Sequence, residues 1–116
     1  VDLPILADEA CQTYDDVERL APYYDGINIK LMKCGGVAEA RKMITLARKL
    51  GMQVMVGCMT ETRAGISAAT VLSPLVDYAD LDGHVLIAND PYDGIQIVDG
   101  KLTLVDKPGT GVSPLH

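Results

Sequence analysis

Four short apolar segments of the chain each end in side chains that could do chemistry. These segments cover residues 4–7, 26–29, 53–57 and 77–81. The side chains at their ends are Asp8 and Glu9, then Lys30, then Cys58, Met59 and Glu61, and finally Asp80 and Asp82. One charged residue at a strand end usually marks only where the strand meets solvent. Repetition at four successive ends favours a shared pocket, because the parallel strands of a β/α barrel open their carboxyl ends onto one face.

Carboxylates and a lysine at one barrel mouth suit the removal of a proton from a carbon next to a carboxylate. A divalent cation held by oxygen ligands can bind that carboxylate and stabilise the negative charge that develops. A lysine beside such a cation has a lowered pKa and can act as a base near neutral pH. We expect Asp8 to be a Mg²⁺ ligand and Lys30 to be the acid/base group. Because Mg²⁺ usually takes more than one protein ligand, we expect the remaining ligands outside this chain.

The stretches between the four segments have helical spacing. Residues 37–50 place apolar side chains on one face and end before Gly51. Shorter helices are predicted at residues 15–21 and 62–72. Strands that alternate with helices in this way form parallel sheets through right-handed crossovers, so the sequence predicts an α/β fold.

The pattern changes after residue 93. Residues 95–98 and 102–105 are strand-like and are separated by Asp99-Gly100, a dipeptide typical of hairpin turns. Residues 108–114 have the composition of a loop, and we assign them no secondary structure.

Composition excludes several classes of function. The 116 residues are 48% hydrophobic, enough for one domain with a real core. The net charge of -6 and the lack of a Lys/Arg cluster argue against a nucleic acid partner. No apolar run approaches the roughly 18 residues that span a bilayer, and no signal sequence begins the chain, so we expect no membrane partner and a cytoplasmic location.

Three widely spaced cysteines form neither a disulfide framework nor a zinc site, which agrees with a reducing compartment. Because the chain begins with Val1 and enters a strand at once, we expect a fragment of a longer protein.

Two motifs resemble those of the enolase superfamily, in its muconate-lactonizing subgroup. Residues 4–10, Pro-Ile-Leu-Ala-Asp-Glu-Ala, resemble the P-x-x-A-D-E-S stretch that ends the fifth barrel strand. Its Asp is a magnesium ligand and corresponds to Asp8. Residues 28–36, Asn-Ile-Lys-Leu-Met-Lys-Cys-Gly-Gly, are similar to the N-I-K-L-x-K-x-G-G motif of the sixth strand. Its first lysine is a catalytic acid/base and corresponds to Lys30, whereas Lys33 is implied to have a supporting or structural role.

Two further segments resemble the dipeptide epimerases of that superfamily. Residues 57–62 look like the G-x-M-x-E-[ST] loop of the seventh strand, whose Met contacts substrate and corresponds to Met59. Residues 80–83 resemble the D-x-D motif after the eighth strand, which receives the α-ammonium group of the substrate. Asp80 and Asp82 would have that role here. Two carboxylates that face a pocket favour a cationic group, which agrees with a peptide substrate.

The resemblance implies the C-terminal half of a TIM-like (β/α)7β barrel with parallel strands, followed by a β-hairpin tail. Residues 1–93 would hold strands five to eight, and residues 94–116 would be a hairpin and tail that return toward an absent capping domain. Family members also have a K-x-K motif and two acidic metal ligands on earlier strands, which this chain lacks. We therefore expect the fragment to be inactive alone and to need the missing N-terminal half or self-association.

The predicted function is that of a magnesium-dependent epimerase or racemase of dipeptides. One alternative is a muconate cycloisomerase or an o-succinylbenzoate synthase, whose substrates carry no ammonium group. Another is a non-catalytic half-barrel assembly module, which would form a stable dimer and bind no metal.

Three other residues and one segment receive structural interpretations. We interpret His84 as a satisfied or solvated loop residue and Cys58 as a small apolar thiol. Glu61 is interpreted first as a cap of the third helix, with support of the metal-site hydrogen bonds as the alternative. Residues 89–94 are interpreted as a turn near the mouth of the barrel.

Overall fold

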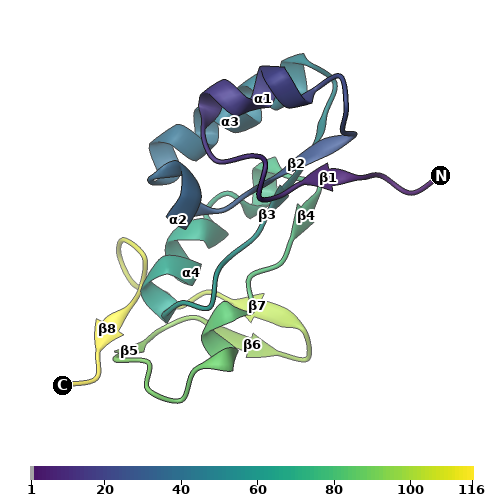
Figure 1. Ribbon diagram of the computed structural model, residues 1–116. Helices are drawn as coiled ribbons and strands as arrows, with labels where there is room; N and C mark the ends of the chain where they lie inside the picture. The colour runs from purple at the N-terminus through teal and green to yellow at the C-terminus, as the bar shows by residue number, and fades with distance from the viewer. Residues whose placement is uncertain (1) are drawn as a thin grey trace.

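The computed structural model describes residues 2–116 and contains a four-stranded parallel sheet (Figure 1). Its strands are β1 (Leu6–Ala7), β2 (Gly26–Ile29), β3 (Gln53–Val56) and β4 (Tyr78–Ala79). They lie in sequence order, and each is parallel to the next. Every strand falls inside one of the predicted segments, although β1 and β4 are shorter than expected. The predicted parallel α/β fold is confirmed.

Helices connect successive strands of this sheet (Figure 1). Helix α1 (Tyr14–Leu20) follows β1, α3 (Val37–Lys49) follows β2, and α4 (Arg63–Thr70) follows β3. Their bounds agree with the predicted helices to within two residues. Gly51 adopts a left-handed conformation, with φ of 73°, and directs the chain out of α3 and into β3.

The core lies between the helices and one face of the sheet. Because side chains alternate along a strand, every second residue of β2 and β3 points to this face. These residues are Ile27, Ile29, Val54 and Val56, and all are fully buried. The other face carries Leu6, Met55 and Tyr78, which line an open groove of about 350 Å³ together with Leu3 and Pro4. In a closed barrel this second face points to the interior.

The C-terminal part of the chain contains the predicted hairpin. Strands β6 (Gln96–Val98) and β7 (Lys101–Thr103) pair antiparallel. Asp99 and Gly100 between them have φ angles of 49° and 75°, the positive values that a tight hairpin turn requires. The division of the chain after residue 93 stays a prediction, and residue 1 lies outside the described part.

One expectation for the tail was wrong. Residues 108–114 were assigned no secondary structure, but β8 (Ser113–Pro114) pairs antiparallel with β5 (Tyr92–Asp93). Each of these strands has only two residues, too few to show a periodic pattern. Three short helical segments were also missed: α2 (Leu31–Cys34), η1 (Ser73–Leu75) and η2 (Gly83–Leu86). No helix of residues 2–116 has the length and apolar character that crossing a membrane would need.

Candidate active site

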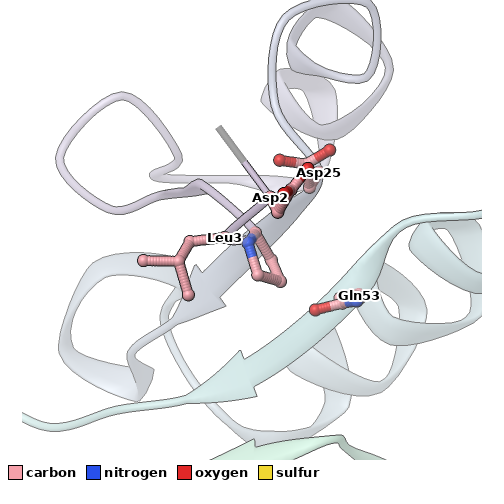
Figure 2. Close-up of a pocket in the computed structure, with 5 residues that line it drawn as sticks. Asp2, Leu3, Asp25 and Gln53 are labelled. Atoms are coloured by element: carbon pink, nitrogen blue, oxygen red, sulfur yellow. The ribbon is translucent and has the colours of Figure 1, made fainter.

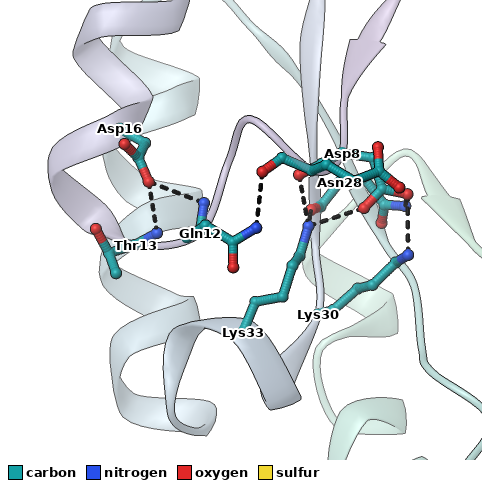
Figure 3. A network of polar contacts seen from close by, with 8 residues as sticks. Asp8, Gln12, Thr13, Asp16, Asn28, Lys30 and Lys33 are labelled. Carbon is teal, nitrogen blue, oxygen red and sulfur yellow. Dashed lines mark hydrogen bonds and ion pairs between the residues drawn. The ribbon is translucent and has the colours of Figure 1, made fainter.

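Asp8, Lys30 and Lys33 meet at the carboxyl ends of β1 and β2 (Figure 3). The Nζ atom of Lys30 lies 2.9 Å from Asp8 Oδ2, and that of Lys33 lies 2.8 Å from Asp8 Oδ1. Lys33 also donates to the main-chain carbonyls of Asp8 and Asn28, at 2.7 and 3.1 Å. Its side chain is 6% exposed. Three oxygen acceptors therefore hold Lys33 in place, which agrees with a structural role.

The short helix α2 explains how both Lys30 and Lys33 reach the carboxylate of Asp8. Lys30 is extended and immediately precedes this helix, so its side chain continues the alternation of β2. One helical turn later the chain brings Lys33 back over the end of β2, where it reaches Asp8. Gly35, with φ of 93°, then ends the helix.

The two lysines keep Asp8 ionised. Partial burial raises the pKa of Asp8, but the hydrogen bonds and charges of Lys33 and Lys30 outweigh this effect. The pKa of Asp8 therefore lies below its ordinary value. The result is a fixed carboxylate beside a lysine that has no further ion-pair partner among residues 2–116.

Asp80 and Asp82 lie together after β4. They line an open cavity of about 360 Å³, whose wall also includes Val85 of η2 and the hairpin residues Ile97 and Leu102. Both aspartates are exposed, so their carboxylates are accessible to a ligand. The cavity thus combines two negative charges with apolar walls.

The loop of Met59 packs beside this pair. Gly83 follows Asp82, and a Cβ atom at Gly83 would collide with the carbonyl oxygen of Met59. The Met59 side chain itself is exposed. All five predicted site residues therefore follow the carboxyl ends of the four strands. The structure joins Asp8 to Lys30 directly, and it places Asp80 and Asp82 around one cavity.

The capping role expected for Glu61 was wrong. Thr62 is the N-cap residue of α4, and the amide of Arg63 in its first turn donates to Asp90 Oδ2 at 2.8 Å. Glu61 Oε1 instead accepts a hydrogen bond from the Met59 amide at 3.1 Å. Glu61 therefore orders the Met59 loop, a contact between neighbours that the capping pattern alone does not distinguish.

His84 is neither satisfied nor solvated, contrary to expectation. It is 2% exposed, and neither ring nitrogen has a partner in the part of the chain that the structure describes. Burial lowers the pKa of His84, as does the positive charge of Arg63, whereas Asp90 and Asp82 raise it. The net pKa is below the ordinary value, so the ring is neutral at pH 7. Cys58 agrees with the apolar interpretation, because burial raises its pKa and keeps the thiol protonated.

Asp90 and Arg63 form an ion pair that sequence analysis did not identify. Asp90 Oδ2 accepts from the main-chain amide and from Nη1 of Arg63, at 2.8 and 3.2 Å, while its Oδ1 accepts from the Tyr92 amide. Arg63 Nε donates to the carbonyl of Ile95. Residues 89–94 are thus more than a turn near the mouth, because they hold the start of α4 against the segment that leads to the hairpin.

Replacing Asp90 with alanine should destabilise the complete protein by about 3 kcal/mol, the lower end of the cost of breaking a buried ion pair. The Asp90 side chain is 4% exposed, whereas water still reaches Arg63. Urea unfolding measures the change. Asp106→Ala is the matched control, since Asp106 is exposed in the same tail. Equal losses in both variants would contradict a structural role for the ion pair.

A second pocket lies at the other end of the sheet (Figure 2). It has a volume of about 150 Å³ and is lined by Asp2, Leu3, Pro4, Asp25 and Gln53. Asp25 Oδ2 accepts a hydrogen bond from the Ile5 amide at 2.8 Å, which fixes the entry into β1. At the amino ends of barrel strands such contacts serve stability, so this pocket is not the candidate active site.

The residues present fit one ligand of a magnesium site. Asp8 offers the hard carboxylate oxygen that Mg²⁺ prefers, and it does so at the strand end where Lys30 also lies. Residues 2–116 contain no group of three or more His, Cys, Asp or Glu side chains that could hold a metal ion. A complete site would need further ligands.

Comparison with known proteins agrees with this arrangement. The chain is 60% identical over 110 residues to the L-Ala-D/L-Glu epimerase of Bacteroides thetaiotaomicron, covering 95% of this chain and 29% of that protein. A substrate-liganded L-Ala-D/L-Glu epimerase from Bacillus subtilis superposes with a TM-score of 0.88 at 34% identity, over 97% of this chain and 33% of that one. The dipeptide epimerase of Methylococcus capsulatus, solved with Mg and the dipeptide L-Arg-D-Lys, gives a TM-score of 0.85 at 39% identity, over 92% and 32% of the two chains.

The chain spans about a third of the length of these relatives. The similar structures are barrels of the enolase superfamily, so the four parallel strands and the hairpin correspond to the C-terminal half of such a barrel. The family described as Enolase C-terminal domain-like matches residues 1–115. The chain therefore belongs to the Enolase C-terminal domain-like family.

Proposed function

We propose that the complete protein is a Mg²⁺-dependent epimerase of dipeptides, in which Lys30 is the acid/base group and Asp8 a metal ligand. The observation that carries this proposal is the 2.9 Å contact between Lys30 Nζ and Asp8 Oδ2. It puts a proton-transfer group beside a hard oxygen ligand at the carboxyl ends of two adjacent parallel strands. The named activities and the Mg of the similar proteins support the same assignment.

Lys30 transfers the proton at one face of the substrate α-carbon. Its Nζ removes the proton next to the substrate carboxylate, and returns one when the reaction runs in the other direction. A second acid/base group for the opposite face lies outside this chain. Mg²⁺, when bound, supplies positive charge that stabilises the developing negative charge on the substrate carboxylate. Lys33 keeps Asp8 in one orientation throughout, since it bonds to that residue twice.

Asp80 and Asp82 bind the amino end of the substrate. Their carboxylates face an open cavity and are exposed, so an ammonium group can enter and donate charge-assisted hydrogen bonds to them. Met59 contacts the substrate from the neighbouring loop, which Glu61 holds in place. The cycloisomerase alternative is disfavoured here, because its substrates offer these carboxylates no positive charge.

The rest of the barrel has to complete the site. Strands β1 and β4 each pair on one side only among residues 2–116, and the apolar groove of Leu6, Met55 and Tyr78 is open. Unpaired strand edges promote association with another chain. We propose that the missing N-terminal half, or a second copy, covers these edges, and that the protein works in the cytoplasm. The free edges also fit an assembly module, which would bind no metal.

Incubation of the complete protein with L-Ala-L-Glu in D₂O tests the proposal. We expect deuterium at the α-carbon of the C-terminal residue, together with the epimer, since that proton lies next to the free carboxylate. Removal of metal with EDTA should stop both the deuterium exchange and the formation of the epimer, and added Mg²⁺ should restore both reactions. Nuclear magnetic resonance follows the exchange. A protein that binds dipeptides and metal but exchanges no α-proton would contradict the epimerase assignment.

A further inference from the structure

Asn28 lies in the middle of the sheet, directly behind Asp8. It belongs to β2, is 8% exposed, and donates from Nδ2 to Asp8 Oδ2 at 3.1 Å (Figure 3). Its main-chain carbonyl oxygen accepts a hydrogen bond from Lys33. Asn28 therefore contacts both the carboxylate and one of the two lysines that hold it.

The side-chain amide of Asn28 fits only because residue 57 is glycine. A Cβ atom at Gly57 would lie 2.6 Å from Asn28 Oδ1 and 2.9 Å from Asn28 Nδ2, closer than real Cβ atoms come to other heavy atoms. The backbone there cannot easily withdraw, because the Gly57 amide donates to the Ile29 carbonyl at 2.8 Å. Gly57 is required for the space it leaves, since its backbone is not left-handed.

The amide can take one orientation. An ionised carboxylate only accepts hydrogen bonds, so Nδ2 must face Asp8 and Oδ1 must face away. Asn28 Oδ1 is buried and has no partner in the chain from residue 2 to residue 116. Turning the amide over would set two oxygens against each other beside Asp8. A side chain at position 57 would thus displace Asn28 rather than reorient it.

We propose that Gly57 and Asn28 are positioning residues for the metal ligand, and this rests on the proposed role of Asp8. Lys33 holds Asp8 Oδ1, and Asn28, in the space that Gly57 leaves, holds Asp8 Oδ2. Asn28 is neutral and approaches from the buried side, so unlike Lys30 it does not place a positive charge where a cation binds. Replacing a residue that hydrogen-bonds to a metal ligand typically changes the affinity for the metal.

A double-mutant cycle on Mg²⁺ binding, measured by calorimetry on the complete protein, tests the inference. Asn28→Ala and Gly57→Ala should each weaken Mg²⁺ binding by about 10- to 100-fold. If Gly57→Ala acts by displacing Asn28, the double variant should bind Mg²⁺ no more weakly than Asn28→Ala alone. Additive losses, or a Gly57→Ala variant with the wild-type affinity, would overturn the inference.

Gly65→Ala is the control for a glycine substitution elsewhere. Its added Cβ meets the Glu61 side chain at α4 rather than Asn28, so the Mg²⁺ affinity should stay unchanged. Should Gly57→Ala fail to fold, the double variant is expected to fold, because Asn28→Ala removes the atoms with which the Cβ collides. Asn28→Ala creates no collision, and wild-type Mg²⁺ affinity in that variant would overturn the inference by itself.

The proposed function can fail separately. The wild-type protein could bind Mg²⁺ and the cycle could be non-additive while no dipeptide exchanges its α-proton. That result would support the positioning role and contradict the proposed epimerase activity. A wild-type protein that shows no Mg²⁺ binding overturns the positioning role, because Asp8 is then no metal ligand.

Discussion

Replacing Lys30 with methionine should lower the turnover of the complete enzyme by about 10²- to 10⁴-fold, the usual contribution of an acid/base group. Methionine keeps the length of the side chain and removes its proton-transfer atom. The same change should strengthen Mg²⁺ binding, because it removes the ammonium group 2.9 Å from Asp8 Oδ2, where a cation would bind. Steady-state kinetics and calorimetry measure the two effects independently.

Lys42→Met provides the control for this change. Lys42 is exposed on α3 and pairs with Glu39, so neither turnover nor Mg²⁺ binding should respond. Far-ultraviolet circular dichroism should show the same fold for both variants. A Lys30→Met enzyme that still exchanged the substrate α-proton with solvent deuterium on both faces would remove Lys30 from the mechanism.

Replacing Asp82 with asparagine should narrow the preference of the complete enzyme for a free dipeptide over its N-acetylated analogue by about 10- to 150-fold. This range corresponds to one charge-assisted hydrogen bond of about 1.5 to 3 kcal/mol. An ammonium group gains such bonds from Asp80 and Asp82, whereas a neutral acetyl group leaves both carboxylates poorly paired. The ratio of the two kcat/KM values, compared between wild type and variant, gives the result.

The matched control for the loss of charge is Asp106→Asn, an exposed aspartate of the tail. Its ratio of kcat/KM values should equal that of the wild type. Two results would contradict a dipeptide substrate: an unchanged ratio in Asp82→Asn, or a wild type that prefers the N-acetylated dipeptide. A cycloisomerase would then become the better candidate.

Local periodicity was sufficient to predict most of the sheet and its helices. Helix α3 and strand β2 were predicted almost to the residue, because each has a regular apolar pattern and begins or ends at glycine. The direct contact between Asp8 and Lys30 follows from parallel pairing of β1 with β2, which the alternation of strands and helices indicated.

Features that depend on distant contacts were not predictable. Strands β5 and β8 have two residues each and pair across the whole tail, so no local pattern marks them. The burial of His84 and the ion pair of Asp90 depend on how η2 and the segment that leads into β5 pack against α4. The space that Gly57 leaves for Asn28 likewise arises between two strands, and composition at either position does not reveal it.

The groups proposed for proton transfer and those proposed for recognition lie on different kinds of backbone. Asp8 and Lys30 follow strands packed into the core, whereas Met59 and Asp82 belong to the loops that follow β3 and β4. Loops tolerate substitution better than the strands that carry them. Redesign toward another carboxylic acid can therefore begin with the loop residues and leave the ends of β1 and β2 untouched, so that substrate choice and proton chemistry can be altered one at a time.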